Sequence, residues 1–140
     1  YGNCRIQGPL FTCPEMAMAS AFTIVTCERL IEHEEMIRYP NRASIPFFSV
    51  DAVIEVPFGA YPGNCHGLYY FDEDHIAEFR NACETLRKGN PEPLQAYYDN
   101  YIFNVENTNG FISKIPLHKL QYVQKIEPGI RLDAGYTVLG

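Results

Sequence analysis

The sequence predicts an α/β fold, in which helices flank a partial, open and mostly parallel sheet. Two short apolar runs predict strands, and segments with helical spacing follow each of them. Residues 21–27 (AFTIVTC) carry no charge and are rich in β-branched residues, which is typical of a buried strand in a parallel sheet. Val50 to Val56 predicts a second buried strand. Because two strands cannot be buried on both faces by themselves, we expect the missing strands to come from another segment or another chain.

Helix start and stop signals predict the elements around the first strand. Thr12 and Glu15 have the spacing of a capping box, which predicts a short helix through residues 16–21. Residues 30–40 predict a short surface helix that closes before Pro40, because a residue that precedes proline avoids the helical region.

The clearest helix signal spans residues 72–91, where acidic residues open the segment and basic residues close it before a glycine and a proline. One stripe of this helix carries Ile76, Phe79, Cys83 and Leu86. A further helix is expected over about 91–103, with aromatic residues that pack in the core of this chain or on a partner. Residues 106–110 predict a turn, and residues 111–129 a mixed tail with a break at Pro116.

Length and composition restrict the classes of function. The 140 residues, 46% of them hydrophobic, are expected to form a single domain over 1–140. The net charge of −6 is spread along the chain without a basic cluster, so we expect no nucleic-acid partner. We also expect no membrane anchor, since the apolar runs are too short. An odd number of widely spaced cysteines predicts a reduced, cytoplasmic protein; they are Cys4, Cys13, Cys27, Cys65 and Cys83.

The loop after the second strand, residues 56–67 (VPFGAYPGNCHG), is rich in residues with special backbone properties. Gly59, Gly63 and Gly67 permit positive φ, while Pro57 and Pro62 stiffen the path between them. This frame suits a rigid loop that exposes main-chain N–H groups toward an acyl or carboxylate group. It equally suits a defined turn against a neighbouring subunit.

Side-chain chemistry points to no catalytic residue and no metal ligand in this chain. Cys65 and His66 are adjacent, but neighbours on an extended loop point apart and no third group orients them, so an ordinary loop cysteine is favoured. The histidines lack the spacing of a zinc site; they are His33, His66, His75 and His118.

Two glutamates lie where the predicted strands end. Glu28 and Glu55 could face a ligand crevice, because ligands of open α/β sheets bind at the carboxyl ends of strands. Alternatively, each one only marks the point where its strand meets solvent.

Ordered motifs identify a family resemblance. The sequence contains IVTCE, IP, VDAV, PFGAYP and CHGLY in this order between residues 24 and 69. This series closely resembles the C-terminal half of the A (alpha) chain of glutaconate CoA-transferase and related family I CoA-transferases. The resemblance extends from residues 2–8 (GNCRIQG) to residues 123–129 (VQKIEPG).

The resemblance implies half of an A subunit, in a hetero-oligomer with B subunits and with the remainder of the A subunit. It implies transfer of CoA between an acyl-CoA and a short carboxylate or dicarboxylate such as glutaconate, with CoA as a substrate and no covalently bound cofactor. In the family a glutamate of the B subunit is the nucleophile of a ping-pong mechanism, so this chain alone should be inactive. The substrate-binding residues that we expect are Gly59, Ala60, Tyr61, Pro62, Gly63 and Asn64.

Two departures from the family pattern matter. Relatives often read G-A-H-P-S where this chain has Tyr61 and Gly63 at the third and fifth positions, which leaves the acyl preference open. The glycine-rich segment near the N-terminus of A subunits is not found, so Tyr1 is expected to lie within a longer subunit. The alternatives are a CoA-ester hydrolase or ring-opening enzyme on the same scaffold, and a non-catalytic module that completes another chain's sheet.

Overall fold

The computed structural model describes residues 2–133, and the side chains of residues 2–127. The chain divides into two compact units, the first ending at Gly59 and the second beginning at Ala60. Whether the two act as one folding domain stays a prediction of the sequence.

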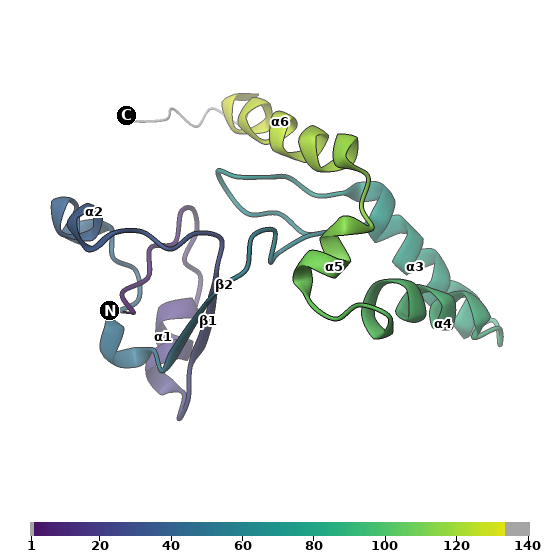
Figure 1. Cartoon of the computed structure of the whole chain (residues 1–140), viewed down its shortest axis with the longest axis horizontal. Helices are drawn as coiled ribbons and strands as arrows, with labels where there is room; N and C mark the ends of the chain where they lie inside the picture. Colours follow the sequence, from purple (N-terminus) through teal and green to yellow (C-terminus); the bar gives the residue numbers. More distant parts are fainter. Residues whose placement is uncertain (1, 134–140) are drawn as a thin grey trace. The chain divides into compact units, whose positions relative to one another are not determined.

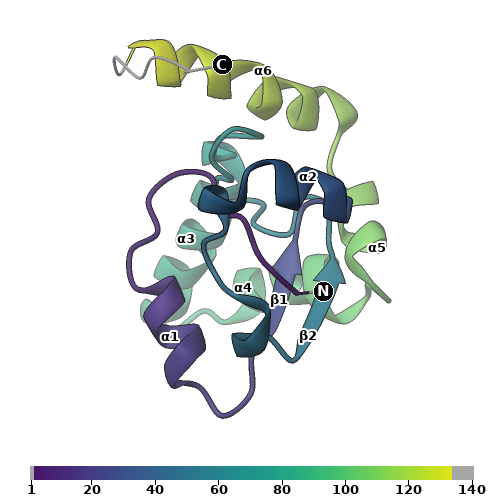
Figure 2. The ribbon, with the colours of Figure 1, turned by 90° about the vertical axis from the view of Figure 1, so that its left-hand side faces the viewer.

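The first unit builds a small parallel sheet with short helices (Figures 1 and 2). Its strands are β1 (Ile24–Cys27) and β2 (Ala52–Glu55), which pair in parallel from Ile24 opposite Ala52 to Cys27 opposite Glu55. The other elements are α1 (Cys13–Ala19), α2 (His33–Arg38) and the 3-10 turns Pro40–Arg42 and Phe47–Ser49. The predicted α/β class and the parallel pairing are confirmed.

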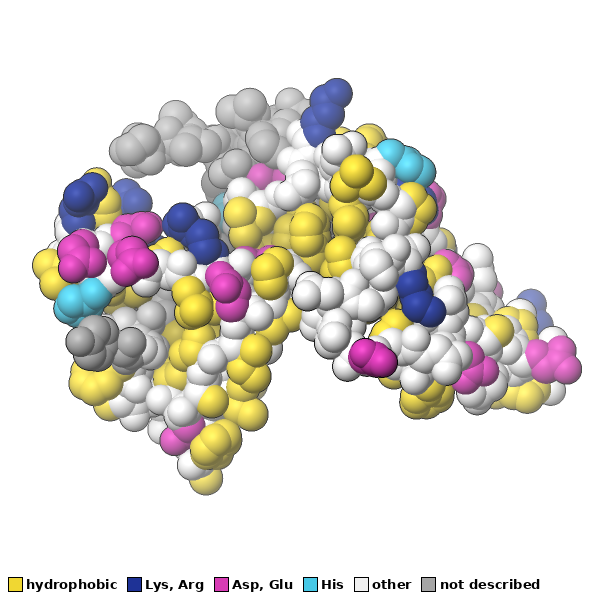
Figure 3. Space-filling view, viewed as in Figure 1, with side chains coloured by type: hydrophobic (Ala, Val, Ile, Leu, Met, Phe, Trp, Pro, Cys, Tyr) yellow, Lys and Arg dark blue, Asp and Glu magenta, His cyan; other side chains and the backbone are white. Residues whose placement is uncertain are grey.

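The prediction that both strands are buried is wrong for this chain by itself. Ile24 in β1 is 58% exposed and Ile54 in β2 is 50% exposed. Within the described residues the sheet has only these two strands, so each strand has one unpaired edge and no full layer covers its faces. Apolar side chains therefore lie on the visible surface of the first unit (Figure 3).

The first helix forms without the predicted capping box. Thr12 precedes α1, but its side chain makes no capping hydrogen bond. Its backbone has φ −102° and ψ 12° instead of the extended conformation that aims a hydroxyl at the first-turn amides. The hydroxyl lies 3.5 Å from the sulfur of Met16.

The second unit is helical (Figure 1). It contains α3 (Glu73–Arg87), α4 (Glu92–Tyr98), a π-helical turn (Asp99–Phe103), α5 (Thr108–Ser113) and α6 (Leu117–Asp133). Its most buried side chains include Tyr69, 1% exposed, and Val123, 2% exposed. The backbone N–H of Tyr70 donates to the carbonyl of Val123, so the segment before α3 lies along α6.

The predicted apolar stripe is not the buried face of α3. Ile76 and Phe79 are 37% and 38% exposed, whereas His75 is 4% exposed and Ala82 6%. The rings of Tyr97 and Tyr101 pack against His75, with centroids 5.6 and 4.6 Å away, so the aromatic residues after α3 select this face. These two tyrosines thus pack within the chain.

The tail is more helical than the sequence predicts. The expected turn at residues 106–110 is wrong in part, because α5 begins at Thr108. Asn107 caps this helix by accepting a hydrogen bond from the N–H of Gly110 at 3.0 Å. The break at Pro116 is confirmed, and α6 starts directly after it. No helix in the described part of the chain is long and apolar enough to cross a membrane.

Candidate functional site

The loop at residues 56–67 follows β2 and crosses the boundary between the two units. Its first part, through Gly59, is held by residues of the first unit, and the rest by residues of the second.

Glu28, the residue after β1, binds the first part of the loop. Its Oε2 accepts the N–H of Phe58 at 2.7 Å, and its Oε1 accepts the N–H of Gly59 at 3.1 Å. Phe58 has φ 59°, in the left-handed region that costs an ordinary residue about 1–2 kcal/mol. A Cβ on Gly59 would lie 2.8 Å from the carbonyl oxygen of Val56. The Glu28 carboxylate thus stabilises a turn whose backbone conformation is unfavourable for Phe58.

Glu55, the last residue of β2, makes the reciprocal contact. Its Oε1 accepts the N–H of Leu30 at 2.9 Å. Because β1 and β2 are parallel, their carboxyl ends are adjacent, and each glutamate reaches the segment that follows the other strand. Both carboxylates bind backbone amides, an arrangement that neither of the two sequence-based interpretations describes.

Tyr61 and Asp72 anchor the second part of the loop. Tyr61 is 6% exposed and donates its hydroxyl hydrogen to the carboxylate of Asp72, which is 5% exposed. Asp72 also caps α3 by accepting the N–H of His75 at 3.0 Å, and its own N–H donates to the carbonyl of Pro62. The amino group of Lys119 lies 3.8 Å from the Asp72 carboxylate.

This arrangement sets the charge state of the anchor. Burial by itself would raise the pKa of Asp72, but the hydrogen bonds from Tyr61 and from the His75 amide, with Lys119 nearby, outweigh burial and lower it. Burial, and then the hydrogen bond to Asp72, raise the pKa of Tyr61. The pair is therefore an ionised carboxylate bound to a neutral phenol.

His75 is a core histidine with a partner. Its Nε2 lies 2.9 Å from the hydroxyl of Tyr97. Burial lowers the pKa of His75 below 6.5, so the ring is neutral at neutral pH. Among the residues that the structure describes, no group of three or more His, Cys, Asp or Glu side chains is suited to hold a metal ion.

The loop amides are used within the chain. Besides those of Phe58 and Gly59, the N–H of Ala60 donates to the Tyr69 hydroxyl at 3.0 Å, and that of Gly63 to the Ala60 carbonyl at 2.7 Å. The expectation of N–H groups aimed at a ligand is not met at these four positions.

The far end of the loop is anchored by a third carboxylate. Gly67 has φ 86°, and its N–H donates at 2.7 Å to Oε1 of Glu127, which is 3% exposed. Gly67 alone among the three loop glycines has the positive φ that the sequence analysis allowed. At Gly59 and Gly63 glycine is favoured by lack of space instead, because a Cβ at either position would lie 2.8 Å from a backbone carbonyl oxygen.

Cys65 and His66 lie at the end of the loop. Cys65 pairs with Tyr69 in a short antiparallel bridge, with N–H to carbonyl hydrogen bonds of 3.0 Å in both directions. These contacts are made by the backbone, and the interpretation of Cys65 as an ordinary loop cysteine stays a prediction of the sequence.

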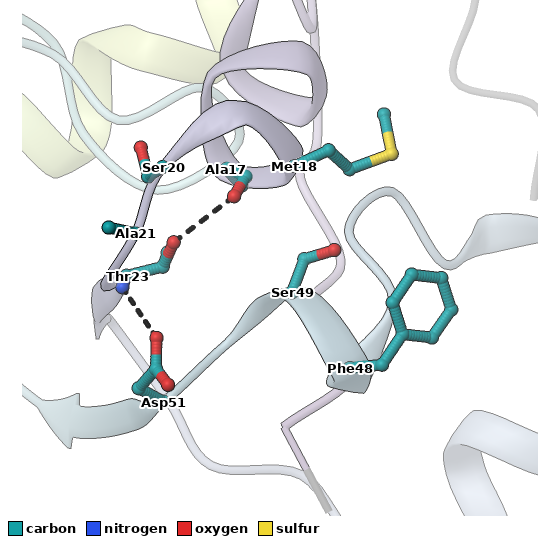
Figure 4. A pocket seen from close by; sticks show the side chains of 8 residues that line it. All are labelled: Ala17, Met18, Ser20, Ala21, Thr23, Phe48, Ser49 and Asp51. Carbon is teal, nitrogen blue, oxygen red and sulfur yellow. Dashed lines mark hydrogen bonds between the residues drawn. The ribbon is translucent and has the colours of Figure 1, made fainter.

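A hollow of about 330 Å³ lies in the first unit, at the amino ends of the strands (Figure 4). It is lined by Ala17, Met18, Ser20, Ala21, Thr23, Phe48, Ser49 and Asp51. The Thr23 N–H donates to Asp51 at 2.7 Å, and the Thr23 hydroxyl to the Ala17 carbonyl at 3.2 Å. Because ligands of α/β sheets bind at the opposite, carboxyl ends of strands, we assign no ligand to this hollow.

Similar proteins agree with the family resemblance of the loop and strand motifs. The chain is 33% identical over 129 residues to the A subunit of glutaconate CoA-transferase from Acidaminococcus fermentans, a match that covers 92% of this chain and 38% of that protein. The crystal structure of glutaconate coenzyme A-transferase from the same organism superposes with a TM-score of 0.80 and 30% identity, covering 87% of this chain and 37% of that one.

The chain is a relative of CoA-transferase A subunits.

Two further proteins are similar to this chain. The A subunit of 3-oxoadipate CoA-transferase from Pseudomonas knackmussii is 29% identical over 81% of this chain. An uncharacterised protein from Archaeoglobus fulgidus is 37% identical over 91% of the chain. No family model matches. The chain spans 28% to 38% of the length of these curated relatives.

The sequence predicts where the loop lies, but it does not predict which carboxylates bind the loop. The sequence indicates Glu28 only as a crevice residue or a strand end, Asp72 as part of a helix start, and Glu127 as part of the tail. A local signal exists for Asp72, since an acidic residue before a helix is a typical cap. For Glu127, 60 residues from Gly67, the sequence holds no such signal.

Proposed function

We propose that this chain is part of the A subunit of a CoA-transferase, which moves CoA between an acyl-CoA and a short carboxylate or dicarboxylate such as glutaconate. The observation that carries the proposal is the similarity, over nearly the whole chain, to the A subunit of glutaconate CoA-transferase. The similar fold of the solved enzyme supports it.

In the proposed ping-pong mechanism the nucleophile is a glutamate of a partner B subunit. Its carboxylate attacks the thioester carbonyl, CoA thiolate leaves, and an acyl-glutamyl anhydride forms. The thiolate then attacks the glutamyl carbonyl, which gives a glutamyl-CoA thioester and releases the first acid as a carboxylate. An acceptor carboxylate reverses these steps. The backbone contacts of Glu28 and Glu55 support the assignment of the nucleophile to another chain.

We propose that the loop supplies the wall of the substrate site. The residues are Gly59, Ala60, Tyr61, Pro62, Gly63 and Asn64. Since amides of this segment donate within the chain, the wall acts by its shape and rigidity more than by donors to the substrate. Because the Tyr61 hydroxyl is bound to Asp72, Tyr61 influences acyl preference through the loop that it anchors.

The proposed partners are the remainder of the A subunit, together with a CoA-transferase B subunit, in a hetero-oligomer. The exposed apolar residues of β1 and β2 support this, because a parallel sheet is stable when further layers cover it. The odd number and wide spacing of the cysteines support a reduced, cytoplasmic setting.

The test is activity in the intact assembly. The native protein is purified with any second chain, both masses are measured, and exchange of CoA between an acyl-CoA and added carboxylates is followed. A transferase requires the acceptor, and borohydride or hydroxylamine modifies a partner glutamate after incubation with acyl-CoA. Acyl-CoA consumption without an acceptor and without such an adduct would instead indicate a hydrolase, and absence of both reactions would contradict the proposal.

A further inference from the structure

The geometry of Glu28 demands a carboxylate. Two consecutive amides, of Phe58 and Gly59, point at its two oxygens at 2.7 and 3.1 Å, and we call this arrangement the Glu28 clamp. A glutamine offers only one acceptor oxygen, and its NH₂ group would face an N–H donor. Glutamate is therefore the one side chain of this length that can accept a bond on each of two oxygens.

The Glu28 clamp fixes the direction in which the loop leaves β2. Phe58 has φ 59°, which a side chain with a Cβ rarely adopts without support. Gly59 is pressed against the Val56 carbonyl, to which its N–H also donates at 2.9 Å. If Glu28 is removed, Phe58 is free to return to negative φ, and the chain then leaves the strand in a different direction.

We infer that Glu28 is a positioning residue of the CoA-transferase reaction: it fixes the backbone of residues 56–59, from which the proposed wall of the acyl site continues, and so limits hydrolysis of the acyl group while that group is bound to the enzyme. This inference rests on the proposed function. An acyl anhydride or glutamyl thioester is lost to hydrolysis when water reaches it, so a site of this kind depends on fixed walls. Glu28 does not touch the reacting atoms in this scheme, and acts through the backbone that it holds.

Glu55 provides a comparison within the same structure. It is also a glutamate at the carboxyl end of a strand, but its carboxylate binds Leu30, in the segment after β1. If Glu28 acts through the 56–59 segment, loss of the Glu55 contact should leave the partition between transfer and hydrolysis unchanged.

The experiment uses the full-length A subunit in complex with its B subunit. The variants are Glu28→Gln, which retains one acceptor oxygen, and Glu28→Ala. Glu55→Ala, which removes the contact with Leu30, serves for comparison, and the exposed Glu34→Gln is the matched control. The rates of CoA transfer to a carboxylate and of acyl-CoA hydrolysis are measured on the same preparation. We expect the hydrolysis-to-transfer ratio to rise about tenfold in Glu28→Gln and up to about 10²-fold in Glu28→Ala, the scale of a misplacement of about 1 Å.

A second readout does not depend on activity. Amide hydrogen exchange of Phe58 and Gly59 in the assembled protein should be faster in both Glu28 variants than in Glu34→Gln. Unchanged exchange would show that the Glu28 clamp does not exist. If amide exchange is faster but the hydrolysis-to-transfer ratio stays at the wild-type value, or if the ratio rises equally in Glu55→Ala, the Glu28 clamp exists but has no positioning role. A wild-type assembly that transfers no CoA would refute the proposed function. Amide hydrogen exchange distinguishes this result from absence of the Glu28 clamp, because it does not depend on activity.

Discussion

Replacing Tyr61 with phenylalanine tests the buried anchor of the loop. The change removes one hydroxyl and leaves the ring, so the packing of this 6% exposed side chain is retained. The Asp72 carboxylate loses the donor that Tyr61 provides, but keeps the His75 amide at 3.0 Å and Lys119 at 3.8 Å. A hydrogen bond to a charged group is worth about 1.5–3 kcal/mol. We expect the free energy of unfolding at pH 7 to fall by about that amount.

The effect should depend on pH with a defined sign. In the folded protein the pKa of Asp72 is lowered from its ordinary value of 3.8, so this carboxylate contributes stability that is present above that pH and is lost as pH falls through the folded pKa. Removing the Tyr61 hydroxyl raises the folded pKa toward the ordinary value. The difference between wild type and variant is therefore full at pH 5–7 and shrinks below about pH 4.

The measurement is equilibrium unfolding in urea, followed by far-ultraviolet circular dichroism at pH 7, 5 and 3.5. Tyr122→Phe is the matched control, because Tyr122 lies on α6 and is 60% exposed. The reasoning is refuted if Tyr61→Phe unfolds at the same urea concentration as Tyr122→Phe at pH 7. A loss of stability that grows toward pH 3.5 would contradict the assignment of an ionised Asp72.

Three further predictions concern single positions. Gly59→Ala should destabilise the protein by about 1–3 kcal/mol in urea unfolding, because the new Cβ would lie 2.8 Å from the Val56 carbonyl oxygen. Gly110→Ala should not destabilise it, because no atom lies nearer than 3.8 Å to a Cβ at that position, and equal effects of the two substitutions would contradict the prediction. Asn107→Ala should cost about 1 kcal/mol and speed amide exchange in α5, and unchanged exchange would show that the cap is not needed. Because burial lowers the pKa of His75 below 6.5, an NMR titration should find its ring neutral at pH 6.5. The folded protein should also become less stable as pH falls below that value. A pKa above 6.5 would contradict the assignment of His75 as a core histidine.

Local sequence signals are reliable where a few consecutive residues decide the backbone. The run before Glu28 predicts β1, and the acidic start and glycine stop of residues 72–91 predict α3. The same kind of signal fails at residues 106–110, where Asn107 caps a helix instead of forming an isolated turn. Asparagine stabilises both structures by the same side-chain hydrogen bond, so the letters alone do not separate them.

The α/β class, the order of the main elements and the place of the loop after β2 all follow from the amino-acid sequence. Which side chains hold that loop is decided by the tertiary structure. Glu28 meets Phe58 across 30 residues because parallel pairing sets the ends of β1 and β2 next to each other. Likewise, Tyr61 finds Asp72 only after the loop has folded back onto α3. Backbone propensity is a property of neighbouring residues, whereas the partner of a carboxylate depends on chain segments that packing alone brings together.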